Sequence, residues 1–247
     1  MVKLIANNIS MSYADKEIIK DISLEVSEGE IVSLLGVSGV GKTTLFNILS
    51  GLLVPDCGVV LLDNINITGE AGHISYMLQK DLLLPYKTVI DNVALPLIIR
   101  GEKKLEARNH ADQYFETFGI DGNQNKYPHQ LSGGMRQRAA LLRTYLFSQD
   151  VALLDEPFSA LDTITKSNMH SWYLEIMERI KLSTLFITHD IDEAILLSDR
   201  IYIMTGQPGQ ITFEIKINDQ KPRGDEFLLG KEFITYKRQI LNILHKT

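Results

Sequence analysis

The chain has 247 residues, 45% of them hydrophobic and 23% charged, which is typical of a globular protein with a sizeable core. Its formal net charge of −6 argues against a globally basic surface for nucleic acid, and its single cysteine excludes an internal disulfide. The first residues lack the apolar core of a signal peptide, and every apolar run is far shorter than the about 20 residues that span a bilayer. We therefore expect a protein that does not cross a membrane by itself.

The first third of the chain is predicted to form strands around one helix. Alternating apolar residues over 2–26 predict antiparallel strands, and the apolar run 30–36 predicts a buried strand. Residues 41–52 have helical spacing, and further strands are predicted at 59–67 and 73–79. This alternation of strands and helices is typical of an α/β protein.

A helical block interrupts the alternation. The pattern from Thr88 to Gly119 is helical with breaks at Pro96 and Gly101, and 133–147 also has a helical pattern. Three apolar side chains recur at the spacing of a core face: Ala111, Phe115 and Phe118. We interpret the block from Pro85 to Ser148 as an inserted helical subdomain.

After this block the alternation resumes. A strand is predicted at 151–156, and strand, helix and strand follow over 184–204. A further helix is predicted between the strand at 151–156 and residue 184. Its core face is formed by Met169, Trp172, Ile176 and Ile180. Residues 225–247 are expected to form a helical tail. We therefore predict one α/β domain spanning 1–247, with a mostly parallel core sheet, an N-terminal antiparallel β subdomain and the α-helical insertion.

Residues 36–44, GVSGVGKTT, match the phosphate-binding loop pattern GxxxxGK[ST]. The glycines allow close backbone approach to a ligand, and the N-terminus of the following helix adds about half a positive charge. Lys42 is expected at the β- and γ-phosphates of a nucleotide, and the Thr43 hydroxyl is expected to bind Mg²⁺. The residues expected around the phosphates are Gly36, Ser38, Gly39, Val40, Gly41, Lys42, Thr43 and Thr44.

Two carboxylates end the predicted strand VALLDE, 151–156. Ligands of open α/β sheets bind at the carboxyl ends of the strands, which is where these acids lie. Asp155 suits Mg²⁺, and Glu156 suits general-base activation of the attacking water. A GTPase would need a guanine-reading NKxD segment, but the similar stretch at Asn125 has Pro128 in place of the aspartate.

Three further residues are weaker candidates when taken one at a time. Tyr13 could stack on adenine or simply pack within a strand, and Gln79 could contact Mg²⁺ and the attacking water or belong to an ordinary loop. His189 follows a predicted strand and could be catalytic or structural. Strand ends at Gln79, Asp155 and His189 are expected to converge on the edge of the sheet that carries the phosphate-binding loop.

A second anion-binding pattern occurs at LSGGMRQR, 131–138, directly before a predicted helix. The Ser132 hydroxyl, the amides of Gly133 and Gly134 and the helix dipole would supply donors for a phosphate, yet the segment lacks a lysine.

Taken together and in this order, Tyr13, the phosphate-binding loop, Gln79, LSGG, VALLDE, SALD (159–162) and ITHD (187–190) resemble the ATP-binding cassette (ABC) transporter ATPases, over nearly the whole chain. The resemblance implies a P-loop NTPase that binds ATP and Mg²⁺ and pairs head to tail with a second copy. Ser132, Gly133 and Gly134 would then face the γ-phosphate held by the partner, which supplies the missing lysine. SALD would lie along this interface, and residues around 82–89 would contact a permease on the cytoplasmic side of the membrane.

The residues of three segments indicate a subfamily. LSGGMRQR, the stretch 77–97 and the tail DEFLLGKEF (225–233) are similar to the nitrate, sulfonate and taurine importers, in which a solute-binding protein outside the cell delivers the solute. Importers of hydroxymethylpyrimidine-type thiamine precursors are similar too, so the solute stays open. Met135, which replaces a common glutamine, is interpreted as a packing residue.

Two other classes fit the sequence less well. A soluble ABC ATPase acting on DNA would need long coiled-coil arms, and one acting on ribosomes usually has two cassettes. An exporter cassette is often fused to membrane spans. We therefore expect an importer ATPase with no nucleic-acid partner.

Overall fold

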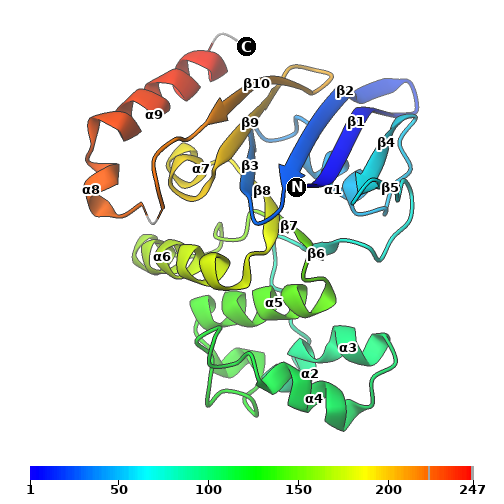
Figure 1. Ribbon diagram of the computed structural model, residues 1–247, viewed down its shortest axis with the longest axis vertical. Coiled ribbons are helices and arrows are strands. Elements are labelled where there is room, and N and C mark those ends of the chain that lie inside the picture. Colours follow the sequence, from blue (N-terminus) through cyan, green and yellow to red (C-terminus); the bar gives the residue numbers. More distant parts are fainter. Residues whose placement is uncertain (222, 246–247) are drawn as a thin grey trace.

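The computed structural model describes residues 1–221 and 223–245, and two β-sheets and a set of helices make up this part of the chain (Figure 1). The strands are β1 (Val2–Tyr13), β2 (Lys16–Ser27), β3 (Ile31–Gly36), β4 (Cys57–Leu62), β5 (Ile65–Asn66), β6 (Ser75–Met77), β7 (Val151–Asp155), β8 (Ser183–Thr188), β9 (Arg200–Thr205) and β10 (Gln210–Lys216). The helices are α1 (Lys42–Leu49), α2 (Val89–Val93), α3 (Leu95–Ile99), α4 (Lys104–Asp112), α5 (Gly133–Phe147), α6 (Thr163–Ile180), α7 (Ile191–Leu197), α8 (Asp225–Leu228) and α9 (Lys231–Leu244), with a 3₁₀ turn at Pro128–Gln130.

The larger sheet has the strand order β10-β9-β3-β8-β7-β6, and its strands are parallel except for β10. Every residue of β3, β7 and β8 is buried, because helices or the second sheet cover both faces. This burial explains why these strands read as continuous apolar runs. Their carboxyl ends meet at one edge, which brings Gly36, Asp155 and Thr188 onto the same side of the sheet.

The smaller sheet is antiparallel in the order β2-β1-β4-β5, as predicted for the start of the chain. Its inner face packs with α1 and the larger sheet in a core that includes Ile9, Ile22, Phe46 and Leu153. The predicted strand 59–67 is in fact a hairpin, because Asp63 and Asn64 form a left-handed turn between β4 and β5.

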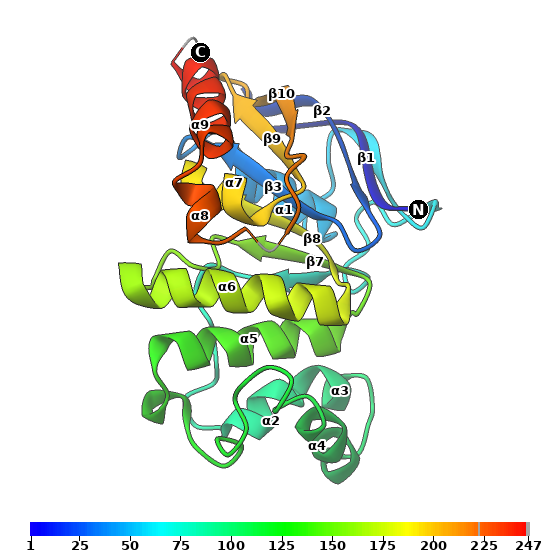
Figure 2. The ribbon, with the colours of Figure 1, turned by 60° about the vertical axis from the view of Figure 1, so that its left-hand side comes forward.

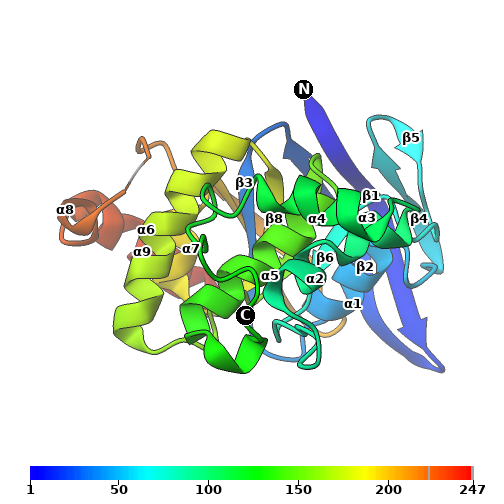
Figure 3. The ribbon, with the colours of Figure 1, turned by 90° about the horizontal axis from the view of Figure 1, so that it is seen from below.

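The helices α2 to α5 lie between β6 and β7 in the sequence and gather at the end of the molecule away from the antiparallel sheet (Figure 1). Helices α5 and α6 lie side by side (Figures 2 and 3), and α5 also contacts β6. The shared core includes Phe115, Phe118, Leu141 and Trp172.

Two details of the helical block differ from the expectation. Pro96 lies in the first turn of α3, where its missing N–H costs little, so the break comes at Ala94 instead. Helix α4 ends at Asp112, so Phe115 and Phe118 belong to turns, although both are fully buried as their spacing indicated.

The C-terminal part contains a strand, β10, that was not predicted, and the tail divides into α8 and α9 around Gly230. The last two residues of the predicted tail, 246 and 247, lie outside the described residues. Arg223 is buried, and its guanidinium donates to the carbonyls of Ile195 (2.8 Å) and Ser198 (2.6 Å) at the end of α7. This contact fastens the C-terminal segment to the larger sheet's helical cover.

Candidate nucleotide-binding and catalytic site

A cavity of about 630 Å³ opens at the carboxyl-end edge of the larger sheet. It lies where β3, β7 and β8 end, which is the usual position of a ligand in such sheets. The residues that line it are Tyr13, Ile18, Ser38, Gly39, Gly41, Lys42, Thr43, Thr44, Gln79, Asp155, Glu156, Ile187 and His189. The structure therefore brings together most of the side chains that the sequence singled out.

The loop between β3 and α1 has a backbone that its glycines allow. Gly41 is the N-cap of α1 with φ of 107°, and a Cβ there would lie 2.5 Å from the Ile19 side chain. With glycine at this position, no side chain covers the first backbone N–H groups of the helix, which remain available to an anion.

Gly36 and Val40 have packing roles rather than a place in the cavity wall. A Cβ on Gly36 would lie 2.5 Å from the carbonyl oxygen of Met204, so the glycine lets the end of β3 lie close to β9. The Val40 side chain is 3% exposed and belongs to the core between the sheets.

Lys42 is the cation of this loop and is 7% exposed. Its ammonium donates to the carbonyls of Gly36 (2.8 Å) and Val37 (2.9 Å). Burial lowers the pKa of Lys42, although the charges of Glu156 and Asp155 oppose that shift. A phosphate in the cavity would offer charged acceptors, which form stronger hydrogen bonds than neutral carbonyls.

Asp155 ends β7 and is 9% exposed. Burial and the neighbouring charge of Glu156 raise the pKa of Asp155, against contacts with Tyr76, Lys42 and Thr43 that lower it. The Tyr76 hydroxyl donates to Asp155 at 3.5 Å, a contact that sequence reasoning missed. Such a carboxylate gains from a nearby cation that replaces its lost hydration.

The residues available for Mg²⁺ are Thr43, Gln79 and Asp155, which all line the cavity. Their oxygen atoms are the ligand type that Mg²⁺ prefers. In the described part of the chain, no group of three or more histidine, cysteine or acidic side chains forms a ready-made metal site. One carboxylate with neutral oxygens fits a cation that takes its other ligands from phosphate and water.

Glu156 lies just beyond β7 in a left-handed conformation, with φ of 47°. Its N–H donates to the Ile187 carbonyl at 3.1 Å, which ties this strained residue to β8. One carboxylate oxygen accepts from Gln79 Nε2 at 3.1 Å, and the other lies 3.0 Å from His189 Nδ1. Gln79 and His189, which follow two different strands, therefore meet at the carboxylate of Glu156.

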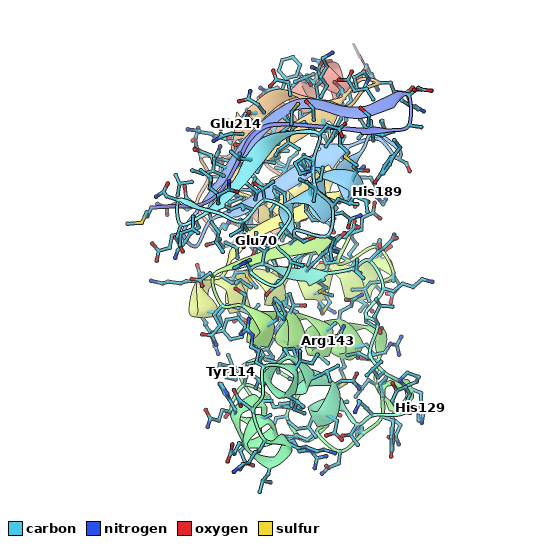
Figure 4. The ribbon with its side chains drawn as sticks, turned by 90° about the vertical axis from the view of Figure 1, so that its right-hand side faces the viewer. Glu70, Tyr114, His129, Arg143, His189 and Glu214 are labelled. Carbon is cyan, nitrogen blue, oxygen red and sulfur yellow. The ribbon has the colours of Figure 1, made fainter. Side chains whose placement is uncertain are left out.

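Tyr13 and His189 flank the cavity with exposed side chains. Tyr13 ends β1 and is 47% exposed, so its ring is accessible for stacking. His189 directly follows β8, and Figure 4 places it in the part of the molecule that contains the sheets. Ile18 on β2 and Ile187 on β8 add apolar lining that sequence reasoning did not identify.

The LSGG segment lies outside the set of residues that line this cavity. Ser132 is the N-cap of α5 and its hydroxyl accepts from the Met135 N–H at 3.3 Å. A Cβ on Gly133 would lie 3.3 Å from Leu161, and one on Gly134 would lie 3.4 Å from Met169. Gly133 therefore lets α5 begin close to the SALD segment, whereas a Cβ on Gly134 would meet α6 at an ordinary contact distance. Met135 packs against the core cluster, as interpreted from the sequence.

The segment after Gln79 is fastened to α5. Arg143 donates to the carbonyls of Leu82 (2.9 Å) and Asp81 (2.5 Å), and Figure 4 shows it on α5. Arg136 lies 3.4 Å from the Asp81 carboxylate. The two arginines are seven residues apart on a helix, so they share a face.

The stretch from Leu78 to Tyr86, which includes this segment, presents apolar side chains to solvent. Leu78, Leu82 and Tyr86 are 42%, 52% and 73% exposed. A second cavity of about 250 Å³, lined in part by Arg143, opens where α1, β6 and α5 adjoin. Leu83 and Val89, which the sequence placed in a contact segment, are buried instead.

Comparison with known proteins identifies the family. A family profile described as ABC transporter matches residues 19–159, a stretch longer than half of the chain. The formylaminopyrimidine import ATP-binding protein of Halalkalibacterium halodurans is 46% identical over 211 residues, which cover 84% of this chain and 82% of that protein. The chain belongs to the ABC transporter family.

Other ABC proteins agree with this assignment. The taurine import ATP-binding protein of Yersinia pestis is 37% identical over 206 residues, 83% of this chain and 81% of that protein. A solved ATP-binding cassette, dimeric and in a post-hydrolysis state bound to ADP and Pi, is 29% identical, has a TM-score of 0.73 and covers 88% of this chain and 100% of that chain. The present chain is therefore an ABC ATPase, and ATP is the nucleotide that it binds.

Proposed function

We propose that this ABC ATPase energises the import of a small solute through a permease. The support comes from the two importer relatives and from an exposed apolar segment, Leu78 to Tyr86, that is anchored to α5 and offers a membrane subunit a place to dock. In the described part of the chain, no helix is both long enough and apolar enough to cross a bilayer. Docked to such a permease, the ATPase would sit peripherally, on the cytoplasmic side of the membrane.

Two solute classes are candidates. The nitrate, sulfonate and taurine class is supported by the wording of LSGGMRQR and by the taurine relative at 37% identity. The pyrimidine class of thiamine precursors is supported by the formylaminopyrimidine relative, which is more similar at 46% identity. In either case a solute-binding protein outside the cell would select the solute.

The proposed hydrolysis follows from the geometry of the cavity. Tyr13 stacks on adenine, and Lys42 and the N-terminus of α1 bind the phosphates. Glu156 accepts a proton from water while the water oxygen attacks the γ-phosphorus. The bond between the γ-phosphorus and the β-phosphate oxygen then breaks, which releases ADP. Gln79 and His189 hold Glu156 and the water in line. Mg²⁺ held by Thr43, Gln79 and Asp155 would neutralise charge that develops on the phosphates.

The active form is proposed to be a head-to-tail dimer. Ser132, Gly133 and Gly134 lie outside their own chain's cavity, so they are free to complete the site of a second copy. ATP binding then favours the closed dimer, and hydrolysis favours opening, which drives the permease. We assign the whole of 1–247 to one cassette, with 85–148 as its helical insertion and 225–247 as its tail.

The test is reconstitution with the permease. ATP hydrolysis by the transporter in lipid vesicles is measured with the solute-binding protein that copurifies with it, and formylaminopyrimidine, taurine and nitrate are added in turn. Stimulation by one class identifies the solute. If the chain copurifies with no membrane subunit and hydrolyses ATP at the same rate with or without one, the importer proposal is wrong.

A further inference from the structure

A group of charged side chains surrounds the turn that carries His189. Glu193, on α7, is only 4% exposed and yet makes several polar contacts. Its carboxylate accepts from the Thr188 hydroxyl, lies 3.0 Å from His170 Nε2 and lies 3.5 Å from the Lys166 ammonium. Lys166 and His170 both belong to α6, so this acid joins α6 to the last residue of β8.

Asp190 holds the other side of the same turn. Its carboxylate caps α7 by accepting from the N–H groups of Asp192 (2.9 Å) and Glu193 (3.2 Å), and it accepts from Lys166 at 2.7 Å. Its own N–H donates to the Thr188 hydroxyl at 3.0 Å. Burial alone would raise the pKa of Asp190, but the hydrogen bonds from Lys166 and the helix N-terminus outweigh it and lower the pKa.

Lys166 is therefore the cation that both acids share. Burial would lower the pKa of Lys166, but the hydrogen bond to Asp190 and the charge of Glu193 raise it overall. Thr188 and Asp190, on either side of His189, are thus held in place by hydrogen bonds. The His189 side chain itself is 62% exposed and contacts Glu156.

Helix α6 connects this network to two other parts of the site. It begins directly after Asp162, its N-cap and the last residue of SALD. The His170 ring packs edge-on against Phe158, with centroids 4.9 Å apart, and Phe158 follows Glu156 by two residues. A displacement of α6 would therefore act on both partners of the contact between Glu156 and His189. It would act on Glu156 through Phe158, and on His189 through Lys166 and the two acids.

We propose that Lys166, Glu193 and Asp190 form a positioning network that holds His189 against Glu156 and links this contact to the SALD segment. None of the three residues is among those that line the nucleotide cavity, so they are positioning residues rather than catalytic ones. This inference rests on the proposed role of His189 in hydrolysis. Removing Lys166 is expected to leave the fold and the phosphate loop in place but to free the turn to shift.

The experiment compares Lys166→Met with a matched control, Lys237→Met. Lys237 on α9 pairs with Asp192, the neighbour of Glu193 in the first turn of α7, and therefore stabilises the same helix without touching the network. In the assembled transporter, Lys166→Met is expected to lower kcat by about tenfold or more with KM for ATP unchanged, because small misplacements of catalytic groups cost that much. Lys237→Met should keep kcat, and Lys166→Arg should restore most of it.

A second pair of variants tests the acids. Glu193→Gln keeps the size of the side chain but removes its charge, whereas Asp192→Asn makes the same change one residue away, outside the network. Only Glu193→Gln is expected to lower kcat. Equal losses of kcat in both pairs, or losses that follow the melting temperature rather than the position of the residue, would overturn the network and leave only a structural role.

His189→Ala is measured in parallel to separate the two hypotheses. If His189→Ala leaves hydrolysis intact, the proposed role of His189 is wrong. If His189→Ala abolishes hydrolysis while Lys166→Met and Glu193→Gln match their controls, His189 is catalytic but the positioning network is refuted. Binding of a fluorescent ATP analogue to the purified chain should be the same for Lys166→Met, Glu193→Gln and the two controls.

Discussion

Nδ1 of His189 and Oε1 of Glu156 lie 3.0 Å apart, although 33 residues separate them in the chain. The contact exists because β7 and β8 are parallel neighbours, so that their carboxyl ends meet. Gln79 donates to the other oxygen of the same carboxylate, which is therefore held from both sides. In the proposed mechanism, these two contacts keep the carboxylate directed at the water molecule that it deprotonates.

Glu156→Gln is expected to keep ATP binding and to slow hydrolysis by about 10²- to 10⁴-fold, because an amide cannot take the proton from water. The variant should accumulate as an ATP-bound dimer, which gel filtration with ATP and Mg²⁺ measures. Asp150→Asn is the control, since Asp150 directly precedes the other end of the same strand and pairs with Lys3. A Glu156→Gln variant that stays monomeric while the wild type dimerises would contradict the role given to Glu156.

Tyr13→Ala is expected to weaken ATP binding by about 1–3 kcal/mol, the usual loss when an aromatic stacking partner of a base is removed. Tyr13→Phe and Tyr13→Trp should bind nearly as well as the wild type, because they keep an aromatic face. Titration with a fluorescent nucleotide measures all three. Equal affinities across the series would assign Tyr13 to packing alone.

Charge at the exposed positions of the docking segment, the stretch from Leu78 to Tyr86 proposed to contact the permease, is expected to separate transport from nucleotide binding. Leu82→Asp and Tyr86→Asp should lower the yield of the assembled transporter or its uptake rate, while ATP binding by the purified chain is retained. Leu105→Asp, at a similarly exposed apolar position on α4, is the control. Leu83 is not a suitable probe, because its side chain is buried and a charge there would unfold the segment.

Ser132→Arg tests whether LSGG serves the partner's nucleotide. It should leave ATP binding to its own phosphate loop intact but block hydrolysis, because the bulk stands where the γ-phosphate of the partner must lie. In a transporter mixed with Lys42→Ala, one composite site carries both changes and the other carries neither, so part of the ATPase activity should return. If Ser132→Arg abolishes ATP binding in the isolated chain, the head-to-tail arrangement fails.

The sequence predicted the parts of the fold that short-range patterns control. Buried parallel strands such as β3 and β7 read directly as apolar runs, and the positions of Gln79, Asp155 and His189 at one edge followed from the parallel order of the strands. The strand β10 did not stand out, because most of its residues are exposed at the edge of the sheet.

Contacts between helices could not be predicted in the same way. Lys166 meets Asp190 and Glu193 only because α6 and α7 pack in a particular register, and the apolar pattern of each helix does not define that register. Arg143 offered a weak signal through its spacing from Arg136, but its partners are backbone carbonyls, which carry no mark in a sequence.

The link from Arg143 to the docking segment has a consequence for how one permease contact is shared. Helix α5 runs from Ser132 past Arg143, a span of about 16 Å at the rise of an α-helix. In the proposed dimer, a displacement of Leu82 is transmitted to its own chain's nucleotide through Gln79. It is transmitted to the partner's nucleotide through α5 and Ser132. Each contact with the permease would thus act on both bound ATP molecules. Hydrolysis at the two sites could then be coordinated without a separate permease surface for each site.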